Sequence, residues 1–168
     1  VILLFLIAIV QNGLAQGWER TITPTTSEEV SYTIKQTADG GYILGGAVSL
    51  NQFGSAKHAL VKLNHRGETQ WQSTTSMNFM SSTIYDLKLT PDGGYIVAGL
   101  RRLTGGNYSD AFLEKYDNLG NSQWMQVYTA TGTGGSAATE VELTPDGGYI
   151  LSGTDQGKML ILKTDSTG

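Results

Sequence analysis

The sequence predicts an all-β fold, and a repeated hairpin motif is the main reason. Thr-Pro-Asp-Gly-Gly-Tyr-Ile occurs at residues 90–96 and again at 144–150, and a variant with Ala in place of Pro occupies residues 37–43. Proline favours the first corner of a tight turn, aspartate tolerates the second, and the first glycine supplies the positive φ that closes the hairpin. The 22 glycines and the lack of amphipathic stretches with helical spacing agree with this reading. We therefore expect a chain of β-hairpins with almost no helix.

The hairpins belong to a longer repeat. Trp18, Trp71 and Trp124 are separated by intervals of 53 residues. The aspartates of the three hairpin turns are separated by intervals of 53 and 54 residues. Repeats of about fifty residues are typical of propeller blades. We expect strands at 32–37, 42–48, 59–64 and 71–75 in the first unit, at 85–90, 95–100, 111–117 and 124–128 in the second, and at 140–144, 149–153 and 159–165 in the third.

These strands predict a β-propeller of four-stranded antiparallel blades. The units would span residues 16–75, 76–128 and, in part, 129–168, with the tryptophans on the outermost strands. Closed propellers have about four to eight blades. The sequence thus predicts an incomplete ring, with Trp18 pairing with another blade, further repeats after Gly168, and a monomer once the ring is complete.

The strand chemistry fits this arrangement. The second strand of each unit is apolar on both faces and is followed at once by small residues, as in Ala98-Gly99, where neighbouring sheets would approach closely. The first strand alternates instead, with Asp86 and Lys88 on one side. That side suits a water-lined central channel.

The first fifteen residues predict export. Residues 1–10 form an apolar run too short to span a membrane, and Gly13-Leu14-Ala15 follows with small residues before a cleavage site. A buried strand is the alternative. We expect residues 1–15 to be a signal peptide cut short at its amino end, a mature chain that begins at Gln16, and membrane contact through the signal peptide alone.

Composition excludes several kinds of site. The net charge is −4 and no basic cluster extends beyond Arg101-Arg102, which argues against a nucleic-acid partner. The chain has no cysteine, so disulfides and thiol chemistry are excluded. His58 and His65 are isolated from recognisable partners in sequence, and we assign them no chemistry. We predict no metal and no cofactor.

Two further segments carry a family resemblance. Lys-Tyr-Asp-Asn-Leu-Gly at 115–120 is followed by Trp124, and Asn-His-Arg-Gly at 64–67 by Trp71. With the hairpin motif they resemble the repeats of secreted bacterial propeller-like proteins, many of them cargo of type IX secretion. The Asp-x-x-Gly-x-x-x-Trp portion is also similar to the tryptophan-docking blades of quinoprotein dehydrogenases and, more loosely, to the Asp boxes of sialidases, although its spacing departs from both. The resemblance implies a propeller outside the cell, and a sorting domain, where one exists, beyond Gly168.

The repeated residues have structural interpretations. Aspartate in such a turn bonds the local backbone, and tryptophans in regular phase seal neighbouring blades. The set with these roles comprises Trp18, Trp71, Trp124, Asp39, Asp92, Asp146, and Gly93 and Gly147, which should have positive φ.

The candidate ligand surface lies on the loops that vary between units, because varied loops on a constant scaffold are where binding usually resides. It comprises Arg101, Arg102, Asn107, Tyr108 and Asp110, Phe79 and Met80 from the connecting loop, and Asp86 and Glu140 at the channel mouth. We predict an exported, non-catalytic module that binds a glycan or protein at the cell surface. The alternatives are a quinoprotein-like or glycosidase-like enzyme fragment, with Asp86 and Glu140 as acid and base, and a structural spacer.

Overall fold

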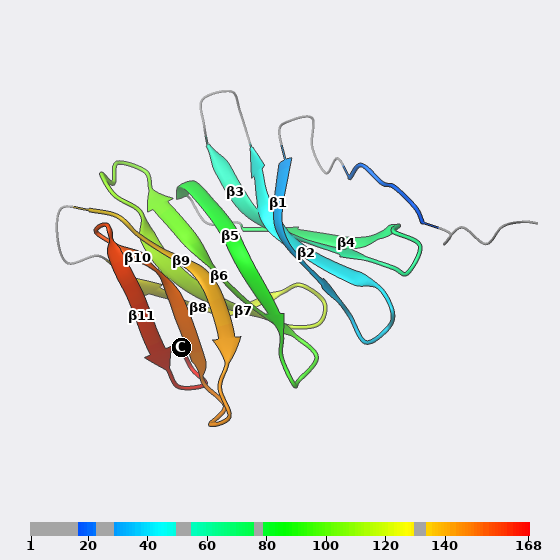
Figure 1. Cartoon of the computed structure of the whole chain (residues 1–168). Coiled ribbons are helices and arrows are strands. Elements are labelled where there is room, and N and C mark those ends of the chain that lie inside the picture. The colour runs from blue at the N-terminus through cyan, green and yellow to red at the C-terminus, as the bar shows by residue number, and fades with distance from the viewer. Residues whose placement is uncertain (1–16, 23–28, 50–54, 76–78, 130–133) are drawn as a thin grey trace, which may run out of the picture.

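The computed structural model describes residues 17–22, 29–49, 55–75, 79–129 and 134–168, and all regular structure in these ranges is β-strand (Figure 1). The predicted signal peptide lies outside the described residues. None of the described residues belongs to a helix that could cross a membrane. The strands are β1 (Glu29–Gln36), β2 (Tyr42–Ser49), β3 (Ala56–Leu63), β4 (Thr69–Thr74), β5 (Phe79–Leu89), β6 (Tyr95–Leu103), β7 (Asp110–Tyr116), β8 (Ser122–Tyr128), β9 (Ser136–Leu143), β10 (Tyr149–Asp155) and β11 (Lys158–Thr164).

Each unit is an antiparallel meander. β1, β2, β3 and β4 pair in chain order in unit 1, β5 to β8 do the same in unit 2, and β9, β10 and β11 in unit 3. One parallel bridge, between Ala56 and Ser81, joins the sheets of units 1 and 2. The prediction of an all-β fold of antiparallel strands is confirmed.

The hydrophobic core lies between units rather than inside one sheet. β5 contacts β1 and β2 of the preceding unit, and β9 contacts β5, β6 and β7. One buried cluster joins Ile43 and Leu60 of unit 1 to side chains of unit 2 such as Leu87 and Val97. A second cluster joins unit 2 to unit 3 and contains Ile96, Ala98, Ala111, Leu113, Ala138, Val141, Tyr149 and Leu151. Units 1 and 2 therefore each bury one face of the sheet against the following unit.

The repeated hairpin turns have the geometry that their residues predict. The amide of Gly93 donates to the carbonyl of Thr90 at 2.9 Å, and the amide of Thr90 donates to the carbonyl of Gly94 at 3.0 Å. Gly93 has φ of 84° and Gly147 φ of 83°, in the left-handed region that favours glycine. The same turn closes the hairpin at Gly40, where φ is 78°.

The second small residue of each pair in the second strands has a different cause from the one predicted. The first strand of each unit is irregular opposite these residues, with shifts of register at 31/33 in β1 and 84/86 in β5. At these irregularities the first strand directs a carbonyl at the glycine of its own unit: a Cβ on Gly99 would overlap the carbonyl oxygen of Thr83. Gly46 and Gly153 stand in the same relation to Val30 and Ala137. These glycines accommodate a bulge within the unit. The first small residue of the pair lies against the next unit, as predicted, at Gly45, which contacts Ile84, and at Ala98, which belongs to the second cluster.

Several strands extend beyond their predicted ends. β5 begins at Phe79 rather than at residue 85, because its first residues pair with the end of β6, Phe79 opposite Leu103 and Ser81 opposite Arg102. Phe79 and Met80 are therefore strand residues and not part of a connecting loop. Residues 17–22 form no strand, contrary to the prediction for Trp18. A strand requires a hydrogen-bonded neighbour, and no described strand pairs with this segment.

Candidate functional site

The topology separates two ends of the molecule. The hairpin turns at 37–41, 90–94 and 144–148 lie at one end, which we call the turn end. The connections from second to third strands and the starts of the first strands lie at the other, which we call the loop end (Figure 1). The loop end varies between units: residues 104–109 join β6 to β7, whereas the two residues 156–157 join β10 to β11.

The predicted ligand residues of unit 2 come together at the loop end. Arg101 stands opposite Asp110 in the β6–β7 ladder, with its Nη2 3.5 Å from Oδ2 of Asp110. Nε of Arg102 donates to the carbonyl of Gly106 at 3.0 Å, which holds the loop that carries Asn107 and Tyr108. Asn107 and Tyr108 are exposed.

Neighbouring strands complete this surface. Met80 is exposed on β5, beside the paired end of β6. The carbonyl of Ser109 accepts from the amide of Ser136 at 2.8 Å, so the loop is also anchored to unit 3. For Phe79 only the backbone is described, and it pairs with Leu103. Arg101, Arg102 and Asp110 are strand residues, and the ladder therefore fixes their backbone positions.

Asp86 and Glu140 do not belong to this surface. Asp86 lies six residues beyond Met80 on β5, which corresponds to roughly 20 Å at the usual rise of a strand. Its carboxylate is buried rather than water-lined, since it accepts from Thr33 Oγ1 at 3.3 Å, Lys88 Nζ at 3.1 Å and the amide of Val141 at 3.2 Å. Asp86 thus links the first strands of all three units. Glu140 is exposed on β9.

The turn end carries the same polar network in each unit. In unit 2 the carboxylate of Asp92 accepts from Thr90 Oγ1, from the amide of Gly94 at 3.1 Å, and from Lys115 Nζ at 2.8 Å. The hydrogen bond from Lys115, followed by that from Thr90, lowers the pKa of Asp92 to about 2. Lys115 also donates to the carbonyl of Tyr116 at 3.1 Å, so one buried ammonium group joins the hairpin turn to β7. The equivalent sets are Thr37, Asp39, Gly41 and Lys62 in unit 1 and Thr144, Asp146, Gly148 and Lys163 in unit 3.

The sequence carried a signal for the lysines that the prediction did not use. Lys62, Lys115 and Lys163 each stand two residues before the Asn or Asp of the next turn. In that turn Asp117 Oδ1 accepts from the amides of Leu119 at 2.9 Å and Asn121 at 2.8 Å. A lysine repeating inside an otherwise apolar strand indicates a buried partner, because an unpaired buried charge is costly.

The tryptophans pack against the following unit. The ring of Trp71, on β4, lies 6.0 Å from that of Tyr95, and the ring of Trp124, on β8, lies 6.1 Å from that of Tyr149. Trp18 stands in the same relation to Tyr42, with ring centroids 5.7 Å apart, although it belongs to no strand. All three contacts join a tryptophan to the tyrosine of a hairpin motif.

A buried polar cluster joins units 1 and 2, and it involves a histidine to which we assigned no chemistry. His58 Nε2, on β3, lies 3.1 Å from Oε2 of Glu114 and 3.2 Å from the hydroxyl of Tyr116, both on β7. Ser122 donates to Glu114 Oε1 at 2.6 Å. Burial, together with the charge of Glu114, raises the pKa of Tyr116 far above its ordinary range. His58 and Glu114 are almost completely buried, so their contact is structural.

One sequence signal for this cluster exists. Glu114 stands in the middle of a strand whose other residues are mostly apolar, and a carboxylate there requires a partner from another unit. The residues that line an adjacent pocket of about 230 Å³ include Thr75, Glu114, Tyr116 and Ser122.

The comparisons add no family to this geometry. No protein-family model matches the chain, and no curated protein matches it. Within the described ranges, no three His, Asp or Glu side chains lie close enough together to hold a metal ion.

Proposed function

We propose that the chain is an exported, non-catalytic binding module of β-propeller type whose loop end binds a glycan or a protein at the cell surface. The observation that carries the proposal is the contrast between the two ends. The turn end repeats one Thr-Asp-Gly-Lys network three times, whereas the loops at the opposite end differ in length and sequence. Constant packing with variable loops is the usual arrangement of a scaffold that presents a binding surface.

The placement of the first strands supports a propeller. β1 contacts β5 and β5 contacts β9, so the first strands of successive units lie side by side, as they do around a propeller axis. The rings of Tyr32 and Tyr85, at equivalent positions in units 1 and 2, are 5.3 Å apart. The tryptophan contacts between units are also in line with the resemblance to tryptophan-docking blades. The apolar segment at residues 1–10 supports export.

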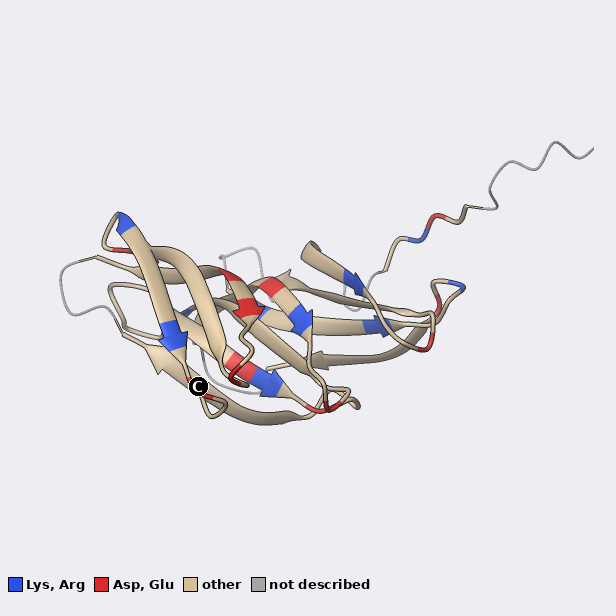
Figure 2. Ribbon diagram, turned by 60° about the horizontal axis from the view of Figure 1, so that its bottom comes forward, with Lys and Arg blue, Asp and Glu red and all other residues tan. Residues whose placement is uncertain are grey.

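The side chains of the loop end favour a ligand whose surface is polar or hydroxylated, or combines polar and apolar groups. Tyr108 and Met80 offer exposed apolar area, and Arg102 and Asn107 offer hydrogen-bond donors beside them. Aromatic, methionine and arginine side chains are enriched in protein interfaces, and an exposed ring suits stacking on a sugar. Acidic and basic residues are intermixed over the three units (Figure 2), which does not favour a strongly charged ligand.

The burial of Asp86 disfavours the enzyme alternative. A glycosidase needs two carboxyl groups that flank the scissile bond. Asp86 instead accepts three hydrogen bonds inside the protein, while Glu140 faces solvent. A spacer without a ligand would need no variable loop end.

Immobilised glycans and proteins of the producing cell surface would test the proposal. Once a ligand is found, we expect Tyr108→Ala and Arg102→Ala each to weaken binding by about tenfold, the loss of roughly 1.4 kcal/mol. Arg66→Ala, an exposed arginine in the turn after β3, is the matched control and should bind as wild type. Equal binding by all three variants would place the ligand elsewhere.

A further inference from the structure

The contact between units 1 and 2 departs from the repeat at a buried position. Glu114 stands opposite Val97 in the β6–β7 ladder, and Val61 and Leu162 stand at the equivalent place in units 1 and 3. Two units thus have an aliphatic side chain where unit 2 has a carboxylate that is 1% exposed. Buried charges often stabilise a fold less than apolar side chains of similar size, and such departures are expected at functional sites. Glu114 is therefore a candidate for a role beyond packing.

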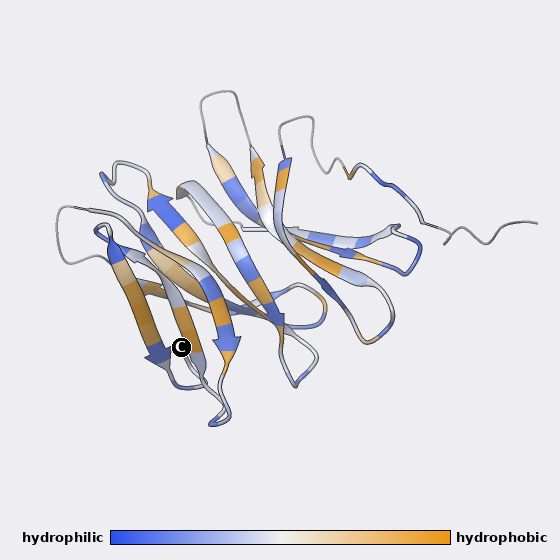
Figure 3. Cartoon of the chain, viewed as in Figure 1, coloured by the Kyte–Doolittle hydropathy of each residue, from blue (hydrophilic) through white to orange (hydrophobic). Residues whose placement is uncertain are grey.

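The facing strand of unit 1 departs from the repeat as well. The amide of Thr75 donates to the carbonyl of His58 at 3.2 Å, and Tyr128 stands opposite the equivalent residue, Ala111, in unit 2. Thr75 is thus the equivalent of Tyr128, a much larger residue that packs, like Leu162, against the second cluster. Figure 3 shows β4, which ends beside Thr75, in blue and white, without the orange of strongly apolar side chains. At the contact with unit 2, this end of β4 therefore presents small polar side chains.

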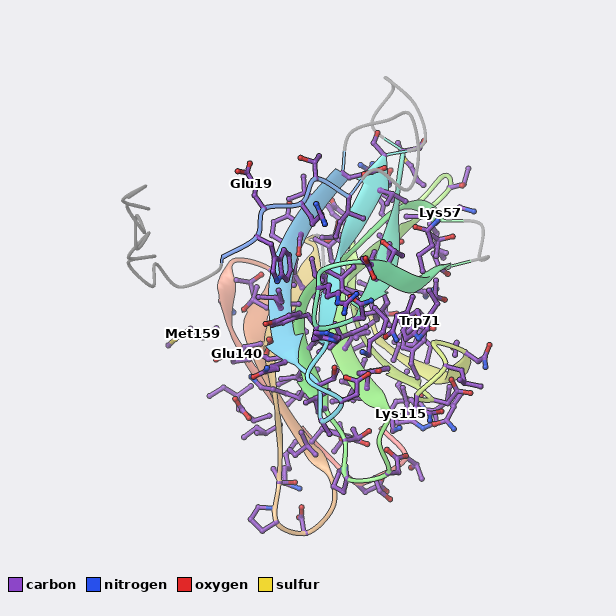
Figure 4. All side chains as sticks on the ribbon, turned by 90° about the vertical axis from the view of Figure 1, so that its right-hand side faces the viewer. Glu19, Lys57, Trp71, Lys115, Glu140 and Met159 are labelled. Carbon is purple, nitrogen blue, oxygen red and sulfur yellow. The ribbon has the colours of Figure 1, made fainter. Side chains whose placement is uncertain are left out.

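A polar pocket of about 230 Å³ lies between these two departures. Its wall includes Ser73, Thr74 and Thr75 at the end of β4 and Glu114, Tyr116 and Ser122 on unit 2. Trp71, which lies on the same face of β4 as Ser73, is labelled in Figure 4 and marks this side of the contact. None of the described residues in the wall is Lys or Arg, and none is a ligand residue of the loop end. The pocket is thus separate from the proposed ligand surface.

The charge in the wall comes from Glu114. Its Oε2 lies 3.1 Å from Nε2 of His58, which is charged only when protonated. Its Oε1 accepts from Ser122 Oγ at 2.6 Å, and Ser122 also lines the pocket. A buried carboxylate is costly without a positive partner, so Glu114 would stabilise a cation that enters the pocket. Tyr116 adds an aromatic side chain to the wall, and aromatic rings attract cations as well.

We propose that this pocket binds a primary alkylammonium group, either of a free amine or of a lysine side chain. An ammonium group has three donors and no acceptor, and Glu114 and the hydroxyl groups of Ser73 and Thr75 offer it acceptors. Drug-sized ligands usually occupy pockets of about 300 to 1,000 Å³, so a pocket of about 230 Å³ suits a ligand with few carbon atoms. The competing occupant is a neutral hydroxylated molecule, which would use the hydroxyl groups alone.

A titration of the full chain, followed by NMR, compares these occupants without any substitution. n-Butylammonium should shift the backbone amides of Gly120 and Ser122 and saturate them, at constant ionic strength. 1-Butanol, a neutral analogue with the same carbon chain, should bind more weakly by about tenfold or more, because it lacks the charge. Equal binding of 1-butanol overturns the proposal. Saturation by methyl glucoside in place of butylammonium also overturns it, as does the absence of saturable shifts.

Two variants test the wall of the pocket. Glu114→Gln keeps the size of the side chain and should weaken butylammonium binding by about tenfold or more. Thr75→Tyr introduces the residue of the equivalent position in unit 2 and should abolish binding by filling the pocket, although the carboxylate is kept. Glu68→Gln, in the exposed turn after β3, is the matched control and should bind as wild type. A folded Glu114→Gln or Thr75→Tyr variant with wild-type affinity overturns the proposal. If neither variant folds, the comparison of butylammonium with 1-butanol on wild type decides.

A second probe distinguishes the two sources of the ammonium group. The peptide acetyl-Gly-Lys-Gly-amide carries the same alkylammonium group on a polypeptide backbone. Saturation of the same amides by both probes supports the lysine of a protein partner as ligand. Saturation by butylammonium alone supports a free amine, because the backbone of the peptide is then excluded. If neither probe binds, the proposal is wrong, while the proposed function of the loop end is unaffected.

Discussion

The indole ring of Trp71 packs directly against the backbone of Gly120, which lies in the following unit. A Cβ on Gly120 would lie 2.6 Å from Cζ3 of Trp71, and Gly120 also has φ of 83°. The contact recurs with Trp18 on Gly67 and Trp124 on Gly168. One glycine therefore meets two requirements, a left-handed turn and a flat surface for the ring.

The two requirements can be separated with alanine. Gly120→Ala should lose about 1 to 2 kcal/mol of unfolding free energy through its positive φ, and more because the methyl group displaces Trp71. Gly93→Ala should show only the loss that comes from positive φ, since Gly93 has φ of 84° and no neighbouring atom within 4 Å of its Cβ position. Urea unfolding of the two variants gives the comparison. Equal losses would mean that the ring of Trp71 moves without cost.

The turn-end networks predict acid sensitivity. The pKa of Asp92 is lowered from 3.8 to about 2, mainly by Lys115, so the folded state holds this proton less tightly than the unfolded chain. Its contribution to stability is complete above about pH 5 and is lost as the pH falls through 4 toward 2. The same pKa direction at Asp39 and Asp146 adds to the effect.

Removal of the lysine tests this assignment. Lys115→Met keeps the buried stem but leaves Asp92 without its main partner, and should flatten the dependence of unfolding free energy on pH between about 5 and 2. Lys163→Met should flatten it less, because the ion pair of Lys163 with Asp146 is more exposed. If the unfolding free energy of Lys115→Met fell between pH 5 and 2 as steeply as that of wild type, other carboxylates would be the cause of the acid sensitivity.

The buried histidine should matter more to stability than the exposed one. His58→Ala leaves Glu114 buried beside a cavity and without its partner. Removal of one member of a buried, oppositely charged pair typically lowers the free energy of unfolding by about 3 to 5 kcal/mol. His65→Ala, in an exposed turn, should change stability by less than about 0.5 kcal/mol. Thermal unfolding measures both. A His58→Ala variant as stable as wild type would show that water replaces the imidazole at no cost.

The strand order was predictable from the sequence because local chemistry determines it. The glycine of each hairpin needs positive φ, and this places the end of one strand and the start of the next within a few residues. The outer limits of strands were not predictable in the same way. Phe79 belongs to β5 because Leu103 is beside it, and that contact depends on the length of β6 rather than on any property of Phe79.

The buried polar contacts were missed for a related reason. His58 and Glu114 lie 56 residues apart in the chain, and only the packing of unit 2 on unit 1 brings them together. The lysines of the turn networks are 17 to 23 residues from their aspartates, and their periodicity was visible. The sequence thus contained a signal for the lysine networks, as it did for the tryptophan contacts, because both repeat, whereas the contact of His58 with Glu114 occurs once and has no such signal.

The last prediction concerns Asp86, whose carboxylate joins three units. Asp86→Ala would leave the buried amide of Val141 without its acceptor. Lys88 would lose its ion pair with Asp86 but keep the one with Glu142, at 2.8 Å. An unsatisfied buried donor costs about 1 to 3 kcal/mol, so we expect a clear fall in the urea midpoint. Glu140→Ala, on the exposed side of β9, should change it little. If the two variants instead unfolded alike, the link through Asp86 would be dispensable for the association of the three units.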